Sequence, residues 1–192
     1  MRSTRCCVNP GKLSRSRNRL AFVKVLETER LTVRELSAAT DAGFICALLN
    51  SPKFLKYIGD RGVRSPEAAA EFIETRYRQS YRDHGFGLYT VELLPDGPQI
   101  GICGFVRRDT LPEPDIGFAY LPEFEGKGFG FEAASAMMEY GRTKLGMRRI
   151  LAITSPENDA SGGLLIKLGF SFDRMLVSGT ETLKLYYSEP AA

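Results

Sequence analysis

Hydrophobic positions along the chain follow two periods. Alternation with more polar residues, as around Leu31 and Val33, predicts strands. Spacing of three or four residues, as for Ala134, Met138 and Leu145, predicts an amphipathic helix. The predicted elements are strand 28–36, helices 41–49 and 66–83, strands 87–94, 100–108 and 116–121, helix 131–145, strand 149–154, helix 158–168, and strands 170–177 and 183–187.

Turn residues mark the ends of several elements. Asn50-Ser51-Pro52 ends the first helix, Ser65-Pro66-Glu67 begins the second, and segment 95–98 joins two strands as a hairpin. The resulting order of strands and helices predicts a single-domain α/β fold of the α+β type. We expect a mixed, mostly antiparallel, twisted sheet of six or seven strands with about four helices on both faces.

Composition fits one domain and places the positive charge at one end. The chain has 192 residues, of which 43% are hydrophobic, and no apolar run approaches the roughly 18 residues of a membrane span. The net charge is +3, but seven basic residues and no acidic ones precede Glu27, so the remainder carries about −4. We therefore expect a flexible basic extension, 1–26, and a domain, 27–190.

The basic extension has several interpretations. Such an arm suits nucleic acid or a membrane surface, and its Arg- and Ser-rich composition is also typical of an organelle transit peptide. A flexible start is favoured over these, so neither nucleic acid nor a membrane is an expected partner. Four cysteines have the spacing of neither a disulfide framework nor a zinc site. We expect a cytoplasmic protein that binds no metal.

A glycine-rich turn, 126–130, separates the strand 116–121 from the helix 131–145. Free N–H groups at the start of a helix hold anions, and glycines let an anion approach the backbone closely. The glycine spacing differs from that of a P-loop and from that of a dinucleotide-binding site. Two interpretations remain, a phosphate cradle of another kind and a tight turn without a ligand.

Three passages of the chain together resemble the GNAT superfamily of acetyl-coenzyme A dependent N-acetyltransferases. They are 29–34, 115–133, and 156–161 followed by 167–170. The likeness is greatest to the branch that acetylates the N-terminal alanine or serine of ribosomal proteins. The resemblance implies a GNAT-like fold and an acetyl-coenzyme A co-substrate, whose acetyl group passes to a primary amine by direct attack in a ternary complex.

The resemblance also implies which residues bind the coenzyme. Backbone groups of the strand pair with the pantetheine amides, N–H groups of the glycine turn hold the diphosphate, and polar residues at the next helix start contact pantetheine or the thiol. Helix N-termini suit a compact dianion, and an amide chain is able to extend a sheet. The implied coenzyme-binding residues are Ala119, Tyr120, Leu121, Gly126, Lys127, Gly128, Phe129, Gly130, Phe131, Asn158 and Ser161.

Some of these residues have simpler alternative roles, and two positions depart from the family. Lys127 is alternatively a solvated side chain, and Asn158 alternatively caps its helix. Glu125 stands where the family usually has Gln or Arg, and a carboxylate repels a diphosphate unless it points away or pairs with a cation. Leu165 stands where many members have the tyrosine that protonates the thiolate. The ribosomal-protein branch implies a serine in that role, so Ser161 is the candidate acid.

Acetyl transfer requires a neutral amine, and therefore a modest base. Asp115, at the start of the strand, is the candidate catalytic base, with Glu113 and Glu157 as alternatives. A backbone N–H of Ala119 or Tyr120 is expected to polarise the carbonyl. The single histidine, at position 84, is expected to sit at a helix end instead.

The sequence does not name the acceptor amine. We expect it to bind beside the loop 57–64 and near Tyr77, Tyr81 and Leu183. The acceptor is expected to be a protein or peptide N-terminus or a small amine. The alternative function is a non-catalytic acyl-coenzyme A binding module of the same fold, and a homodimer is left open.

Overall fold

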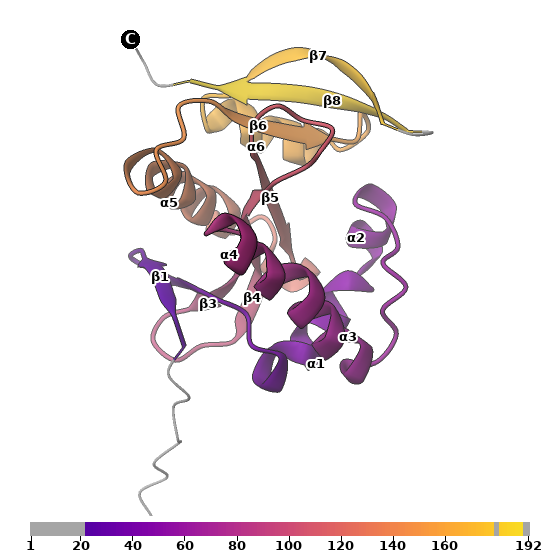
Figure 1. The fold of residues 1–192 in the computed structure, drawn as a ribbon, viewed down its shortest axis with the longest axis vertical. Coiled ribbons are helices and arrows are strands. Elements are labelled where there is room, and N and C mark those ends of the chain that lie inside the picture. The colour runs from indigo at the N-terminus through magenta and orange to yellow at the C-terminus, as the bar shows by residue number, and fades with distance from the viewer. Residues whose placement is uncertain (1–21, 179–180, 190–192) are drawn as a thin grey trace, which may run out of the picture.

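The computed structural model describes residues 22–178 and 181–189. Within these ranges, eight strands form one sheet in the order β1-β2-β3-β4-β5-β6-β8-β7 (Figure 1). Every neighbouring pair is antiparallel except β5 and β6, which run parallel. The strands are β1 (Lys24–Glu27), β2 (Leu31–Arg34), β3 (Leu88–Leu93), β4 (Gln99–Val106), β5 (Asp115–Tyr120), β6 (Ile150–Thr154), β7 (Ser171–Ser178) and β8 (Glu181–Ser188).

Helices cover both faces of this sheet, as predicted. Met137 and Leu165 pack with Phe105 in a core on one face, while Ile45 and Ile73 pack with Ile102 in a core on the other. The predicted α+β class is therefore confirmed. The helices are α1 (Ala38–Leu49), α2 (Pro52–Tyr57), α3 (Pro66–Phe72), the π-helical η1 (Ile73–Arg78), α4 (Gln79–His84), the 3₁₀-helical η2 (Pro122–Phe124), α5 (Phe129–Thr143) and α6 (Asp159–Lys167).

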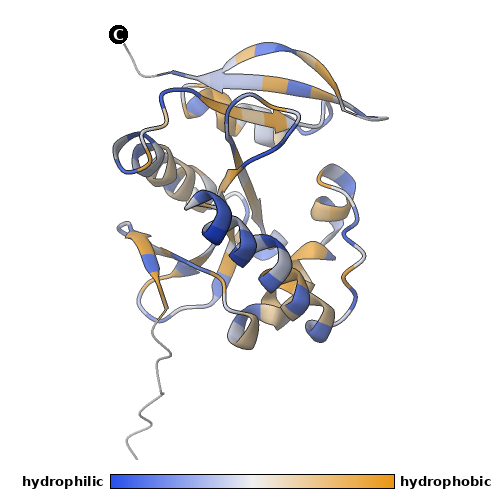
Figure 2. Ribbon diagram, viewed as in Figure 1, coloured by the Kyte–Doolittle hydropathy of each residue, from blue (hydrophilic) through white to orange (hydrophobic). Residues whose placement is uncertain are grey.

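The burial of each helix follows its residue pattern. Helix α5 buries Ala133, Ala134, Met137, Met138 and Gly141, which recur at helical spacing, and its other positions lie nearer the solvent. Helix α4 has no buried residue and is almost entirely hydrophilic in Figure 2. The neighbouring β6 is strongly hydrophobic in the same view because its residues are covered on both faces.

The sheet has one strand more than the six or seven expected. The predicted first strand, 28–36, is shorter, and β1 precedes it as its antiparallel partner. The expected boundary between an extension and a domain after residue 26 falls inside β1, because Val25 and Leu26 pack against the core. Residues 1–21 of the basic extension, with Cys6 and Cys7, lie outside the described residues.

Helix α2 was not predicted from the sequence, whereas the predicted helix 66–83 is present. Asn50-Ser51-Pro52 was expected only to end a helix, yet Pro52 is also the first residue of α2, where its fixed φ and missing N–H cause no loss. The predicted helix 66–83 is present as α3, η1 and α4 in continuous succession. Ser65 caps it by accepting a hydrogen bond from the N–H of Ala68 at 3.2 Å, and Gly85 ends it with a left-handed φ of 75°.

The sheet opens in its middle, between β5 and β6. These strands share only the pair Asp115 and Leu151, at the start of β5. Beyond that pair they diverge, whereas β5 keeps its full ladder with β4. The gap places the backbone of β5 beside the glycine turn and the start of α6, and it determines where a ligand can enter.

Candidate functional site

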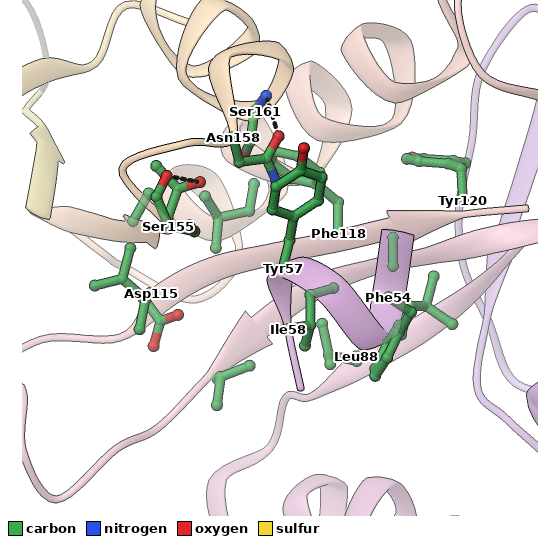
Figure 3. A pocket seen from close by; sticks show the side chains of 18 of the residues that line it. Phe54, Tyr57, Ile58, Leu88, Asp115, Phe118, Tyr120, Ser155, Asn158 and Ser161 are labelled. Carbon is green, nitrogen blue, oxygen red and sulfur yellow. Dashed lines mark hydrogen bonds between the residues drawn. The ribbon is translucent and has the colours of Figure 1, made fainter. Parts of the chain in front are cut away.

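A cleft of about 1410 Å³ occupies the gap between β5 and β6. Its walls come from α2, η1, β5, β6, the glycine turn and the start of α6, and Figure 3 shows side chains from these elements around it. The predicted site residues that line it are Asp115, Ala119, Tyr120, Gly126, Gly130, Asn158 and Ser161. Those that do not line it are Leu121, Lys127, Gly128, Phe129 and Phe131.

The glycine turn forms an anion-binding helix start. Gly126 and Gly128 have left-handed φ angles of 72° and 83°, which glycine adopts without strain. The first hydrogen bond inside α5 runs from the N–H of Glu132 to the carbonyl of Gly128, at 3.1 Å. The N–H groups of Phe129, Gly130 and Phe131 therefore have no partner within the helix and carry the positive end of its dipole. Free N–H groups at a helix start of this kind are suited to an anion.

Strand β5 presents alternate backbone groups to the cleft. The N–H of Leu121 donates to the carbonyl of Ile100 on β4, at 2.9 Å. Because backbone groups of successive residues point to opposite sides of a strand, the N–H of Ala119 also faces β4, and those of Phe118 and Tyr120 face the gap. The N–H of Leu121 and of Ala119 is thus committed to the sheet. The N–H of Tyr120 faces the gap, where it is free to bind a ligand. The N–H of Phe118, which the sequence did not suggest, faces the same way.

Asn158 and Ser161 meet at the start of α6. Asn158 is the N-cap, and its side-chain oxygen accepts a hydrogen bond from the N–H of Ser161 at 3.1 Å. Both residues line the cleft, and Figure 3 labels them among its side chains. The Ser161 hydroxyl has no hydrogen-bond partner among the described residues, so it is able to donate to a ligand. The capping role is therefore observed for Asn158, and it leaves the serine side chain free.

Asp115 lies at the point where β5 and β6 are joined. Its side chain is 2% exposed and forms an ion pair with Arg108, whose Nε lies 2.8 Å from the carboxylate. Burial raises the pKa of Asp115, and Arg108 opposes that rise without cancelling it. A carboxylate with a raised pKa is a stronger base than an exposed one. Of the two alternatives, Glu157 lines the cleft and Glu113 does not.

The acidic residues near the glycine turn are paired with cations from distant segments. Glu132, in the first turn of α5, accepts hydrogen bonds from the Thr28 hydroxyl at 2.6 Å and from the Arg30 Nε at 2.6 Å. Glu125, one residue before the turn, forms an ion pair with Lys53 of α2. Lys127 lies over the ring of Phe124 with its Nζ 5.5 Å from the ring centre. The positive charge of Lys53 therefore offsets the negative charge that Glu125 places beside the glycine turn.

The opposite side of the cleft carries the residues expected to contact an acceptor. Tyr57, Arg61 and Tyr77 line it. Tyr81 does not, because its hydroxyl donates to the carbonyl of Leu88 at 2.5 Å and accepts from the N–H of Leu36 inside the core. Burial raises the pKa of Tyr81 well above its usual range. Tyr81 is therefore a packing residue, and that part of the expected acceptor site is wrong.

His84 is the last residue of α4, as expected, and its ring lies 5.9 Å from that of Phe86. Among the described residues, no group of His, Cys, Asp and Glu side chains is arranged to hold a metal ion. No helix in that part of the chain is long and apolar enough to cross a membrane. These facts leave the cleft as the site to be explained.

The family model described as "Acetyltransferase (GNAT) domain" matches residues 30–171. The chain belongs to the GNAT family. An uncharacterized N-acetyltransferase of Bacillus subtilis, YoaA, is 31% identical over 153 residues, which cover 79% of this chain and 85% of that protein. The alanine N-acetyltransferase of ribosomal protein uS5 from Escherichia coli is 33% identical over 102 residues, covering 49% of this chain and 50% of that protein.

The fold agrees with that of a solved GNAT enzyme. The structure of RimL, a ribosomal L7/L12 alpha-N-protein acetyltransferase in complex with coenzyme A, superposes with a TM-score of 0.74 at 14% identity, covering 88% of this chain and 98% of that one. The predicted family is confirmed, and this GNAT protein is an acyltransferase of the N-acetyltransferase type. The family match runs from Arg30 to the start of β7 and includes most of the residues that line the cleft, whereas Leu176, Glu181 and Leu183 lie beyond it.

Proposed function

We propose that this GNAT protein is an acetyl-coenzyme A dependent N-acetyltransferase, and that the cleft between β5 and β6 holds both substrates. The observation that carries the proposal is that Gly126 and Gly130 of a helix start with free N–H groups, an internal strand edge and a free serine hydroxyl line one cleft. A diphosphate, an amide chain and a thioester are the chemical groups that these three features suit. Acetyl-coenzyme A contains all three and supplies the acetyl group.

The glycine turn and β5 provide binding and orientation. N–H groups of Phe129, Gly130 and Phe131 hold the diphosphate, and Gly126 and Gly128 let it approach. Backbone groups of Phe118 and Tyr120 face the gap and pair with the pantetheine amides. One of these N–H groups points at the thioester carbonyl, whose oxygen becomes more negative during transfer. Asn158 fixes the start of α6, so that the Ser161 side chain is held at the same place.

Asp115 and Ser161 carry the proton transfers in this proposal. Asp115 accepts the proton of the incoming amine, directly or through a water molecule, because burial makes its carboxylate more basic. Ser161 donates its hydroxyl proton to the departing sulfur, since Leu165, at the position of the family tyrosine, is buried and apolar. Arg108 positions Asp115 through their ion pair.

The acceptor is proposed to be a protein or peptide N-terminus, or a small amine. The likeness to an enzyme that acetylates an alanine N-terminus favours the first class. Tyr57, Arg61 and Tyr77 line the same cleft, where an acceptor would approach the thioester. A protein N-terminus has a pKa of about 8, so part of it is already neutral near pH 7, and Asp115 is needed only to accept the proton that the amine releases when it attacks the thioester.

Thiol release tests the proposal. The protein is incubated with acetyl-coenzyme A and a panel of ribosomal-protein N-terminal peptides, polyamines and aminoglycosides, and free thiol is followed. The Ser161→Ala variant is expected to lower kcat about 100-fold and to leave the Kd for coenzyme A unchanged. Ser135→Ala is the matched control, because Ser135 lies on α5 outside the cleft. Equal kcat for both variants would remove Ser161 from the mechanism.

A second candidate function is a non-catalytic acyl-coenzyme A binding module. The observation in its favour is Leu165, which is 1% exposed in the core where many family members have a proton-donating tyrosine. Coenzyme binding without thiol release for any amine would support the module. Absence of coenzyme binding would overturn both functions.

A further inference from the structure

Three carboxylates surround the start of α5, where the proposed function places a diphosphate. Glu123 lies in η2, Glu125 one residue before the glycine turn, and Glu132 in the first turn of the helix. Without compensation their negative charge would repel an anion. The ion pairs of Glu125 and Glu132 therefore decide whether the turn is a usable anion site.

The two paired carboxylates differ in how they are held. Glu132 is bound by the Thr28 hydroxyl, by the N–H of Arg30 and by the Arg30 side chain, which also donates to the carbonyl of Lys127 in the glycine turn at 3.3 Å. Glu125 has one partner among the described residues, Lys53. Both Lys53 and Glu125 line the cleft, whereas Arg30 and Glu132 do not line it.

Lys53 reaches the turn from a separate element. It is the second residue of α2, 72 positions before Glu125 in the chain. Its side chain is 57% exposed, and that of Glu125 is 28% exposed, so the pair adds little to folding stability. The ion pair joins distant segments and lies on the wall of the cleft. Because it adds little stability, we expect its main electrostatic effect to be on a ligand in the cleft.

We infer that Lys53 is a positioning residue for the coenzyme. Its ammonium group neutralises Glu125 and so allows a carboxylate to stand beside the diphosphate-binding turn. The inference rests on the proposed function, because it presupposes that the turn binds coenzyme A. The same ion pair ties α2, which carries Phe54 and Tyr57 on the cleft wall, to the coenzyme side of the site.

Coenzyme A binding measured by isothermal titration calorimetry tests the inference in a set of single and double variants. Lys53→Ala exposes the Glu125 charge, and the Kd for coenzyme A is expected to rise about three- to tenfold at low ionic strength. Glu125→Gln alone is expected to leave the Kd equal or lower. In Lys53→Ala with Glu125→Gln, the carboxylate is absent, so the Kd is expected to return to within about twofold of the wild-type value.

Further variants separate the charge effect from a structural one. Lys53→Arg keeps the positive charge and is expected to keep the Kd. Lys24→Ala is the matched control, because Lys24 is 58% exposed and forms an ion pair with Glu27 away from the cleft. Raising the salt concentration to about 0.5 M is expected to reduce the effect of Lys53→Ala, since screening weakens repulsion between exposed charges. Thermal unfolding is expected to be the same for all of these variants.

The outcomes distinguish failure of the inference from failure of the proposed function. If the wild-type protein binds no coenzyme A, the proposed function is wrong and the inference falls with it. If the wild type binds coenzyme A and Lys53→Ala binds equally well, the inference alone is overturned. The inference is also overturned if Lys53→Ala weakens coenzyme A binding and the added Glu125→Gln substitution does not restore it. Lys53 would then act on the ligand independently of Glu125.

Discussion

Replacement of Asp41 by alanine is expected to destabilise the fold severely. Asp41 is fully buried at the start of α1, and its two oxygens pair with the guanidinium of Arg34 at 2.8 and 2.9 Å. The N–H of Ser37 donates to the same carboxylate at 2.7 Å, and the side chain of Gln99 donates at 2.6 Å. The carboxylate therefore joins α1 to β2 and β4 through one buried group.

The expected loss follows from what the substitution leaves behind. Arg34 is also buried, and burial alone would lower its pKa, but the bonds to Asp41 and Glu92 outweigh that effect and raise it. Without Asp41, Glu92 is the one carboxylate among the described residues that still pairs with the Arg34 guanidinium. Breaking a buried ion pair by removing one partner costs about 3–5 kcal/mol. For a chain of this size that corresponds to a fall in Tm of roughly 6–20 °C.

Urea denaturation followed by circular dichroism measures this loss. Asp60→Ala is the control, because Asp60 forms an ion pair with Arg64 that is exposed on both sides, and its removal is expected to change the midpoint little. A loss for Asp41→Ala below about 1 kcal/mol would refute the reasoning that a buried, unpaired Arg34 is costly. Replacing both partners, Arg34→Met with Asp41→Leu, is expected to recover part of the stability, since no fully buried charge is left unpaired and the Glu92 side chain, which loses Arg34, is 25% exposed.

Two further predictions concern the cleft. Arg108→Ala removes the cation that opposes the raised pKa of Asp115, so that pKa is expected to rise further. The acidic limb of the pH profile of kcat/KM is then expected to move to higher pH. A limb that does not move would exclude Asp115 as the base. In Gly128→Ala, an L-residue must adopt the left-handed φ of 83°, at a cost of about 1–2 kcal/mol. Calorimetry is expected to show coenzyme A binding weakened about tenfold, whereas an unchanged Kd would mean that the turn does not hold the diphosphate.

Local patterns were sufficient to predict the central part of the fold. The glycine turn, the helix after it and the capping Asn158 depend on residues close together in sequence, and each lies where it was expected. The hairpin between β3 and β4 and the start of α3 at Pro66 were predicted for the same reason. Backbone preferences of glycine, proline and capping residues act over a few positions, so one sequence reveals them.

Features that depend on distant partners were not predictable in this way. Lys53 and Glu125 are 72 residues apart, and Arg30 and Glu132 are 102 residues apart, so no local signal relates them. Helix α2 was missed because Pro52 suits both the end of one helix and the first position of another. The direction of each backbone N–H in β5 depends on its register with β4, which only the structure shows.

The divergence of β5 from β6 has a consequence for the behaviour of the chain in solution. Unpaired backbone groups along a strand usually invite pairing with other molecules, and proteins protect their outer sheet edges for that reason. Here the unpaired groups of β5 lie in the interior of the sheet, with β6, α2 and the start of α6 around them. A strand from another copy of the protein has no straight approach to them. The unpaired groups of β5 therefore lie inside the sheet, away from its two outer edges at β1 and β7.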